Sequence, residues 1–196
     1  MKYLAAAFGL SLGVAVLAQG PAPATWLDKP LANWNKPGAP IPAAKPAEDE
    51  SIAALSTRCG YLPLLQTTAG ERALVDAGWV PFRVFDKQIV DRDVEIIGGL
   101  AGADGMCRPM SFNVFVFVNG RLAGTLSPQT MESRTDGSIG GAIRLAADDT
   151  IQAGFARYLD KDALCCPSSH VTVRYGIDRK ATPHVVVPVS LRVTRP

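Results

Sequence analysis

The sequence predicts an α+β fold, in which a twisted antiparallel sheet of about six or seven strands packs against one short helix. Three observations support this class. Apolar residues recur with a period of two in segment after segment beyond Gly78, as in strands that bury one face. Residues 68–78 are the one stretch with clear start and stop signals of a helix. The Asn119-Gly120 pair is the favoured two-residue hairpin turn, which indicates antiparallel neighbours.

The chain opens with the layout of a secretory signal peptide over residues 1–18. Lys2 supplies a positive start, residues 4–18 are almost purely apolar, and Val16 and Ala18 fit a small-residue cleavage site. A membrane anchor fits less well, because the run is shorter than the roughly 20 apolar residues that span a bilayer. We therefore expect a periplasmic or secreted protein with no transmembrane anchor after signal cleavage.

The charge balance argues against two further classes of partner. Without residues 1–18 the chain has 19 Lys and Arg residues against 18 Asp and Glu residues, since Lys2 is the only charged residue removed. Nucleic-acid binding normally shows a clustered basic face, whereas these arginines are scattered along the sequence. We expect no nucleic-acid partner and no attraction to a charged membrane surface.

Residues 19–50 are expected to form a Pro-rich extended arm. Proline fixes φ and lacks an N–H, so neither a helix nor a central strand is expected there. The arm nevertheless contains two tryptophans, Trp26 and Trp34. Either they pack on the domain, or they belong to a docking peptide for an envelope partner, since aromatic anchors dominate interface energetics.

Residues 51–196 are expected to form a single disulfide-bonded α+β domain of ordinary size. Its helix covers residues 69–77. Thr68 and Glu71 fit a capping box before it, and Gly78 is a natural left-handed stop after it.

The first strands are expected at residues 79–90 and 93–100, which an Asp-Arg-Asp turn separates. Residues 111–126 then form the Asn119-Gly120 hairpin. The run Val114–Val118 inside it is apolar at every position, which predicts a strand that is buried on both faces.

Three later strands are expected at residues 148–159, 170–177 and 185–193, where alternation predicts one buried face each. Pro188 lacks a donor for the strand ladder, so the last strand is an edge strand or contains a bulge. The apolar residues expected on one face of that strand are Val185, Val187, Val189, Leu191 and Val193.

Four cysteines, Cys59, Cys107, Cys165 and Cys166, are predicted to form two structural disulfides, because exported proteins fold under oxidising conditions. A bond between Cys165 and Cys166 is disfavoured. Adjacent Cα atoms lie about 3.8 Å apart, whereas ordinary disulfides need roughly 4.4–6.8 Å. Each cysteine is therefore expected to pair with a distant one, and two connectivities remain open: 59–165 with 107–166, or 59–166 with 107–165.

No set of residues predicts catalysis, and we expect no metal and no cofactor, because zinc-type cysteine spacing and an EF-hand pattern are both missing. Ser169 and His170 are adjacent in a strand and would point to opposite faces. Converging carboxylates that hydrolyse a cell-wall or glycan substrate are the alternative. The carboxylates considered for that role are Asp91, Asp93, Asp148, Asp149 and Asp162.

Binding residues are expected on polar loops, where function often resides. Residues 127–140 form the longest polar connection, and residues 102–110 form a Gly-rich turn that includes Cys107. Together with the tryptophans of the arm, these loops supply the candidate binding residues, which are Trp26, Trp34, Arg108, Arg134 and Asp136.

Several of these segments together resemble the LppP/LprE family of bacterial envelope proteins. They are "WLDKPLANWNKPG", "RALVDAGW", "DGMCRPMSFNVFVFVNGRLAGTLSP", "SRTDGS" and "DALCCPSSHVTVRY". The hairpin segment and "DALCCPS" are the most specific parts, and the resemblance extends over nearly all of the exported chain. It implies an extracytoplasmic domain and supplies no catalytic residues. Membrane anchoring does not carry over from the family's lipoproteins, because the expected cleavage point has no lipobox cysteine.

The sequence thus predicts an exported bacterial envelope protein of uncharacterised function. We expect a non-enzymatic domain that binds a cell-envelope protein or glycan. A hydrolase acting on a cell-wall or glycan substrate is the alternative, and the oligomeric state is left open.

Overall fold

The computed structural model describes residues 24–45, 52–60, 67–84 and 89–194, so the predicted signal peptide, residues 1–18, lies outside the described residues. Three helical segments occur in the described chain: the 3-10 helix η1 (Trp26–Asp28), α1 (Ile52–Cys59) and α2 (Ala69–Asp76). The strands are β1 (Val80–Phe82), β2 (Ile89–Asp91), β3 (Val94–Ala103), β4 (Pro109–Val118), β5 (Arg121–Thr125), β6 (Ile139–Leu145), β7 (Ile151–Arg157), β8 (Ser169–Asp178) and β9 (Val185–Thr194).

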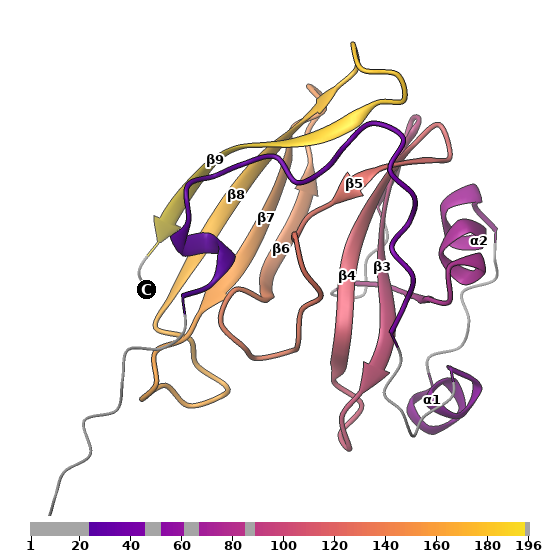
Figure 1. Ribbon diagram of the computed structural model, residues 1–196. Helices are drawn as coiled ribbons and strands as arrows, with labels where there is room; N and C mark the ends of the chain where they lie inside the picture. Colours follow the sequence, from indigo (N-terminus) through magenta and orange to yellow (C-terminus); the bar gives the residue numbers. More distant parts are fainter. Residues whose placement is uncertain (1–23, 46–51, 61–66, 85–88, 195–196) are drawn as a thin grey trace, which may run out of the picture.

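The strands form two antiparallel sheets, seen side by side in Figure 1. In the first sheet the order is β1-β3-β4-β5, and β2 also pairs with β3. In the second sheet the order is β6-β7-β8-β9. The broad α+β class and the antiparallel pairing are confirmed, but the prediction of one sheet of six or seven strands is wrong. The described residues contain nine strands, because the chain leaves the first sheet after β5 and starts a second one.

The two sheets enclose the main hydrophobic core. It combines residues of the first sheet, such as Val114 and Val116, with residues of the second, such as Phe155 and Val173. The opposite face of the first sheet is also covered, because Phe115 and Phe117 pack with Leu74 of α2. The prediction that Val114–Val118 is buried on both faces is therefore confirmed.

The second sheet buries one face only. Along β7 and β8, residues with fully buried side chains alternate with residues that are partly or largely exposed. The face that points away from the core, called the outer face here, is not covered by any helix among the described residues (Figure 1).

Helix α2 forms as its signals predict. The Thr68 side chain accepts a hydrogen bond from the Glu71 N–H at 3.1 Å, and Glu71 accepts from the Thr68 N–H at 3.0 Å, which completes the capping box. Gly78 follows the helix with φ of +84°, in the left-handed region. The short helix α1 was missed, although Gly60 follows it with φ of +64°, a stop signal like that of Gly78.

The predicted β4–β5 hairpin is confirmed. Asn119 and Gly120 both have positive φ, as a type I′ turn requires, and Val118 pairs with Arg121. Strand β9 lies at a sheet edge and its register shifts beside Pro188, as predicted. The prediction that its five apolar residues share one face is wrong. Because of the bulge, Val186 and Pro188 lie on the same face as Leu191 and Val193. All four pair directly with residues of β8 that point inward.

The arm packs on the domain over its described part, residues 24–45. Trp26 makes edge contacts with Trp34 and with Phe155 of β7, while Trp34 also meets Tyr175 of β8. Leu27 is 6% exposed and belongs to the core between the sheets. Of the two interpretations of the tryptophans, the structure therefore shows packing against the domain.

Asn35 of the arm joins the edge strands of the two sheets. Its side-chain amide donates to the carbonyl oxygens of Thr125 in β5 and Val186 in β9, each at 3.1 Å. Its side-chain oxygen accepts a hydrogen bond from the Thr125 N–H at 2.9 Å. The arm, which runs along the edges of both sheets in Figure 1, thus provides hydrogen-bond partners for backbone groups of β5 and β9. We call this junction between the two edge strands the seam.

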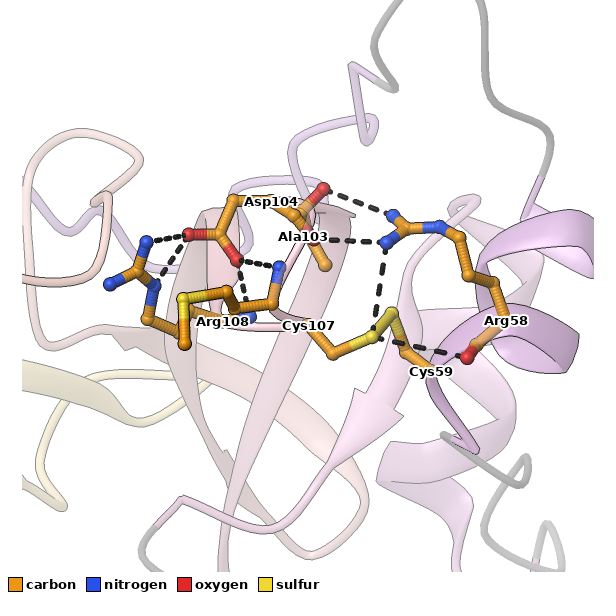
Figure 2. The surroundings of a disulfide bond; sticks show 7 residues. Arg58, Cys59, Ala103, Asp104, Cys107 and Arg108 are labelled. Atoms are coloured by element: carbon orange, nitrogen blue, oxygen red, sulfur yellow. Dashed lines mark hydrogen bonds and ion pairs between the residues drawn. A yellow bond between two sulfur atoms is a disulfide. The ribbon is translucent and has the colours of Figure 1, made fainter.

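Both predicted disulfide connectivities are wrong. Cys59 bonds to Cys107, and Cys165 bonds to Cys166. Cys59 ends α1, which packs beside β3, so it meets the β3–β4 turn that contains Cys107 (Figure 2). Cys165 and Cys166 lie in the connection between β7 and β8, which belongs to the other sheet. Each bond thus joins cysteines at the same sheet, and the expectation that adjacent cysteines would not pair is wrong.

Candidate functional site

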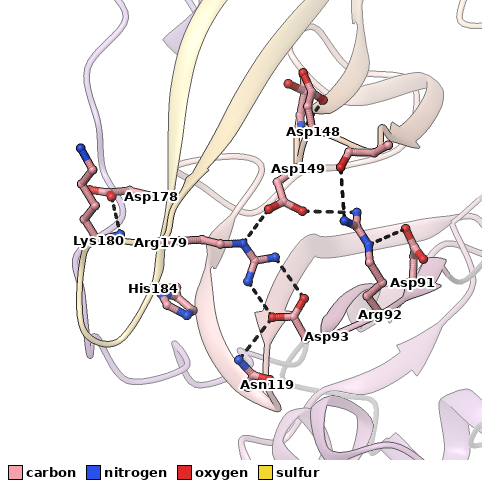
Figure 3. A network of polar contacts seen from close by, with 12 residues as sticks. Asp91, Arg92, Asp93, Asn119, Asp148, Asp149, Asp178, Arg179, Lys180 and His184 are labelled. Atoms are coloured by element: carbon pink, nitrogen blue, oxygen red, sulfur yellow. Dashed lines mark hydrogen bonds and ion pairs between the residues drawn. The ribbon is translucent and has the colours of Figure 1, made fainter.

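Three of the five carboxylates considered for hydrolysis converge at one end of the sandwich, where four strand connections meet (Figure 3). Arg179 of the β8–β9 connection binds both oxygens of Asp93, at 2.6 and 3.0 Å, and Asp149 at 2.6 Å. Arg92 contacts Asp91 at 3.3 Å and Asp149 at 3.4 Å. We call this set of five residues the turn network.

The turn network is suited to holding the sheets together and not to acid–base catalysis. Hydrogen bonds from Arg179 hold the pKa of Asp93 and that of Asp149 below their ordinary values. A general acid at neutral pH needs the opposite, a raised pKa. The arginines also occupy the carboxylate oxygens that a substrate or a water molecule would need.

The two remaining carboxylates lie apart from these salt bridges. Asp162 accepts hydrogen bonds from the Leu159 N–H at 2.8 Å and from the Ser168 hydroxyl at 2.6 Å, so it closes the β7–β8 connection. Asp148 accepts from the Thr150 N–H at 3.1 Å within the β6–β7 turn. Neither residue shows the environment of a catalytic acid, because such hydrogen bonds lower the pKa of both carboxyl groups.

Arg108 and Asp136, two of the predicted binding residues, are engaged in local structure. Arg108 forms an ion pair with Asp104 in the turn that the Cys59–Cys107 disulfide ties to α1 (Figure 2). Asp136 accepts hydrogen bonds from Arg157 at 2.9 Å and from the Tyr158 N–H at 2.8 Å. Both side chains fix loops.

Arg157 extends this anchoring to the arm. It contacts Asp28 of η1 at 2.7 Å in addition to Asp136. Partial burial of the Asp28 carboxyl group opposes its ionisation and raises its pKa. The hydrogen bond from Arg157 outweighs this effect together with the other contacts, so the pKa of Asp28 is lowered. Arg134, in contrast, is exposed in the same loop as Asp136. Of the other predicted binding residues, Trp26 contacts Trp34, and its indole N–H donates to the Gly137 carbonyl oxygen of that same loop at 3.4 Å.

A different surface has the form of a binding site: the outer face of the second sheet. Strand pairing places Arg144 of β6 opposite Gln152 of β7, and Gln152 opposite Arg174 of β8. In the adjoining row, Gly154 of β7 pairs with Thr172 of β8. Arg192 of β9 pairs with Thr172, and Thr194 pairs with His170. All these residues point away from the core, since their neighbours along each strand are the inward ones.

Small residues create a hollow of about 360 Å³ on this face, next to Gly141 and Gly154. A Cβ on Gly154 would lie 3.0 Å from the Gly141 Cα, so the two backbones approach too closely for side chains. The side chains around the hollow are polar or small: Ala142, Arg144, Gln152, His170, Thr172 and Thr194.

The arginines of the outer face differ from those that stabilise turns and loops. Arg92, Arg108, Arg157 and Arg179 each bind a carboxylate. Arg144, Arg174 and Arg192 are exposed and form no ion pair within the described part of the chain. An array of unpaired guanidinium groups is suited to binding carboxylate or phosphate groups.

This surface was missed by the sequence-based prediction of binding residues. Its three arginines lie on three strands and are far apart in sequence, so they look scattered until strand pairing brings them onto one face. The alternation along β8 was the available signal, because it already placed Thr172 and Arg174 opposite the buried residues.

Metal-ligand clusters and membrane-spanning helices are both absent from the described residues. Within the described residues, no three His, Cys, Asp or Glu side chains are grouped so that they could hold a metal ion. No helix in the same residues is long and apolar enough to cross a membrane.

One family model is similar to part of the chain. The model of the LppP/LprE lipoprotein family matches residues 94–180, which is 87 of the 196 residues and runs from β3 to just beyond β8. No curated protein and no solved structure matches the chain. A lipoprotein family indicates a location in the cell envelope. The resemblance to the LppP/LprE lipoproteins that the sequence motifs indicated is confirmed over residues 94–180.

Proposed function

We propose that this protein is a non-enzymatic binding domain of the cell envelope, exported to the periplasm or secreted, and that it binds its partner on the outer face of the second sheet. One observation carries the proposal: this face is an uncovered sheet surface that combines a hollow with three arginines lacking acidic partners. Three other exposed arginines without an ion pair in the described structure, Arg83, Arg121 and Arg134, lie outside this face.

The distribution of polar groups favours binding over catalysis. Asp93 and Asp149 are held by Arg179 at the end of the sandwich, and its hydrogen bonds lower the pKa values of both carboxyl groups. The hollow on the outer face is lined by an arginine, an amide, two threonine hydroxyls and His170. His170 and Ser169 point to opposite faces, so they do not form a nucleophile–base pair.

The proposal is tested by sedimentation with cell-envelope particles prepared from the source cells. The informative variant is Thr172→Trp, because an indole at this position fills the hollow without changing the net charge. We expect the wild-type protein to sediment with the particles, and the variant to need roughly tenfold more particles for half-maximal binding.

The matched control is Thr130→Trp, which adds the same side chain at an exposed position of the β5–β6 connection. Urea unfolding of both variants establishes that they fold. If Thr172→Trp sediments like the wild type and remains folded, the outer face is not the binding surface.

A further inference from the structure

The proposed binding face has the charge pattern of a site for an acidic polymer. Building on the function proposed above, we infer that the outer face of the second sheet binds an extended acidic polysaccharide, a glycan chain with repeated carboxylate or phosphodiester groups. This names the class of ligand and identifies Arg144, Arg174 and Arg192 as the residues that select it.

The positions of the arginines favour a chain over a single anion. Arg144 and Arg174 flank Gln152, so their backbones lie two strand spacings apart, roughly 10 Å. Arg192 is on the next strand and pairs with Thr172, two residues before Arg174. The three guanidinium groups thus start from three strands spread over the sheet, whereas a small-anion site has donors that converge on one point.

The groups between the arginines favour a glycan over a lipid. Gln152, Thr172 and Ser190 lie in the same rows as the arginines and offer amide and hydroxyl groups for hydrogen bonds to sugar hydroxyls. The lining of the hollow has no large apolar side chain that would accept an acyl chain. Gly141 and Gly154 line the hollow and carry no side chain, so backbone atoms form part of its surface.

The charges around the face leave it positive. Asp148 lies close enough to Arg174 for that arginine to contribute to its lowered pKa, after the larger effect of hydrogen bonds within the turn. Arg174 itself donates to the Thr150 hydroxyl at 3.5 Å. Asp178 is at the far end of β8, where it accepts a hydrogen bond from the Lys180 N–H. Arg144 and Arg192 have no ion-pair partner among the residues described.

The test uses the purified full-length protein and three probes: polygalacturonate as an acidic polysaccharide, dextran of similar length as a neutral one, and vesicles containing phosphatidylglycerol. Binding is measured by calorimetry at low and at moderate salt. We expect binding to polygalacturonate that weakens with added salt, since charge pairs with a polyanion are screened. We expect no comparable binding to dextran or to the vesicles.

The decisive variant is Arg144→Gln/Arg174→Gln/Arg192→Gln. It should weaken polygalacturonate binding by roughly tenfold or more, because each arginine contributes one charge contact. The matched control is Arg83→Gln/Arg121→Gln/Arg134→Gln, which removes the same charge from exposed positions outside this face and should leave the affinity within about twofold.

Equal losses in both triple variants would mean unspecific attraction by net charge and would overturn the inference. Binding to vesicles that equals or exceeds binding to polygalacturonate would also overturn it in favour of a lipid surface. If dextran binds as well as polygalacturonate, or if neither binds while envelope sedimentation still depends on Thr172, the acidic ligand is refuted and the binding face survives. If Thr172→Trp has no effect on sedimentation, the proposed function itself fails.

Discussion

At the scale of single residues, Asn35 shows how a side chain in an irregular segment determines tertiary structure. It is 9% exposed, and its amide satisfies the backbone of β5 and of β9 at once. Gly124 lies against the Asn35 side chain and leaves room for it, because a Cβ at Gly124 would clash with Asn35. Gly124 also has φ of +149°, which favours glycine. Buried backbone groups need such partners where strands do not pair.

We predict that Asn35→Ala lowers the free energy of unfolding by about 2–3 kcal/mol, because it leaves the buried backbone of Thr125 and Val186 without the amide. Urea unfolding followed by tryptophan fluorescence measures the change. Lys36→Ala, at the adjacent exposed position, serves as the control and should stay within about 0.5 kcal/mol of the wild type. A loss below that limit for Asn35→Ala would contradict the role of this residue in the seam.

At the scale of secondary-structure elements, α2 depends on its N-terminal cap. Thr68 accepts from the Glu71 N–H and also hydrogen-bonds to Glu95 of β3, so one hydroxyl connects the helix to the first sheet. Glu71 is 1% exposed and accepts from the Thr67 N–H at 2.7 Å. An eight-residue helix has little stability of its own, so these contacts and its packing hold it in place.

We predict that Thr68→Ala destabilises the protein by about 1–2 kcal/mol, the range for loss of an N-cap. Thr68→Ser, which keeps the hydroxyl, should retain most of the stability. Hydrogen exchange of the amides at the start of α2 gives a local measurement. Protection of the Glu71 amide in Thr68→Ala at the wild-type level would show that the cap is unimportant.

The two disulfides should differ in their effect on stability. Cys59 and Cys107 are 48 residues apart, and the chain-entropy model gives about 4 kcal/mol for closing a loop of this size. Cys165 and Cys166 are adjacent, so their bond restricts the unfolded chain very little.

We therefore predict that Cys59→Ala/Cys107→Ala lowers the unfolding free energy by up to about 4 kcal/mol, while Cys165→Ala/Cys166→Ala changes it by less than about 1 kcal/mol. Chemical denaturation measures both. Peptide mapping without reduction should recover Cys59 linked to Cys107. A peptide linking Cys59 to Cys165 or Cys166 would contradict the pairing.

At the scale of the whole molecule, salt bridges connect parts of the chain that are distant in sequence. Arg179 of the second sheet binds Asp93 of the first, and Arg157 binds Asp28 of the arm. The pKa values of Asp28, Asp93 and Asp149 lie below the ordinary value of 3.8. Folding therefore favours the ionised form of these carboxyl groups.

We predict that stability is lost as the pH falls from about 5 through the lowered pKa values of these carboxylates, and that it is fully present above this range. Arg179→Gln should lower stability at pH 7 by about 1 kcal/mol, a modest figure because the pair is partly exposed. The same variant should lose less stability than the wild type between pH 5 and pH 2. Urea midpoints across this range test the prediction, with Arg121→Gln as the control. Parallel pH profiles for wild type and Arg179→Gln would refute it.

Local signals in the sequence were sufficient for several elements. The capping box and Gly78 define α2, Asn119-Gly120 defines a hairpin, and the uninterrupted run Val114–Val118 identifies a strand with two covered faces. Strand β6 was missed because glycines interrupt its alternation, as in "SIGGAIRL". Two sheets form instead of one because β5 pairs with none of the strands β6 to β9.

The sequence by itself determined the class of fold, the main hairpin and helix, and the family resemblance, because each depends on neighbouring residues or on local motifs. Only the tertiary structure decided which cysteines bond, which acids meet arginines, and where unpaired positive charge gathers. The physical reason is that these features depend on distances between segments far apart in the chain. Arg144, Arg174 and Arg192 become neighbours only when β6, β7, β8 and β9 pair in register.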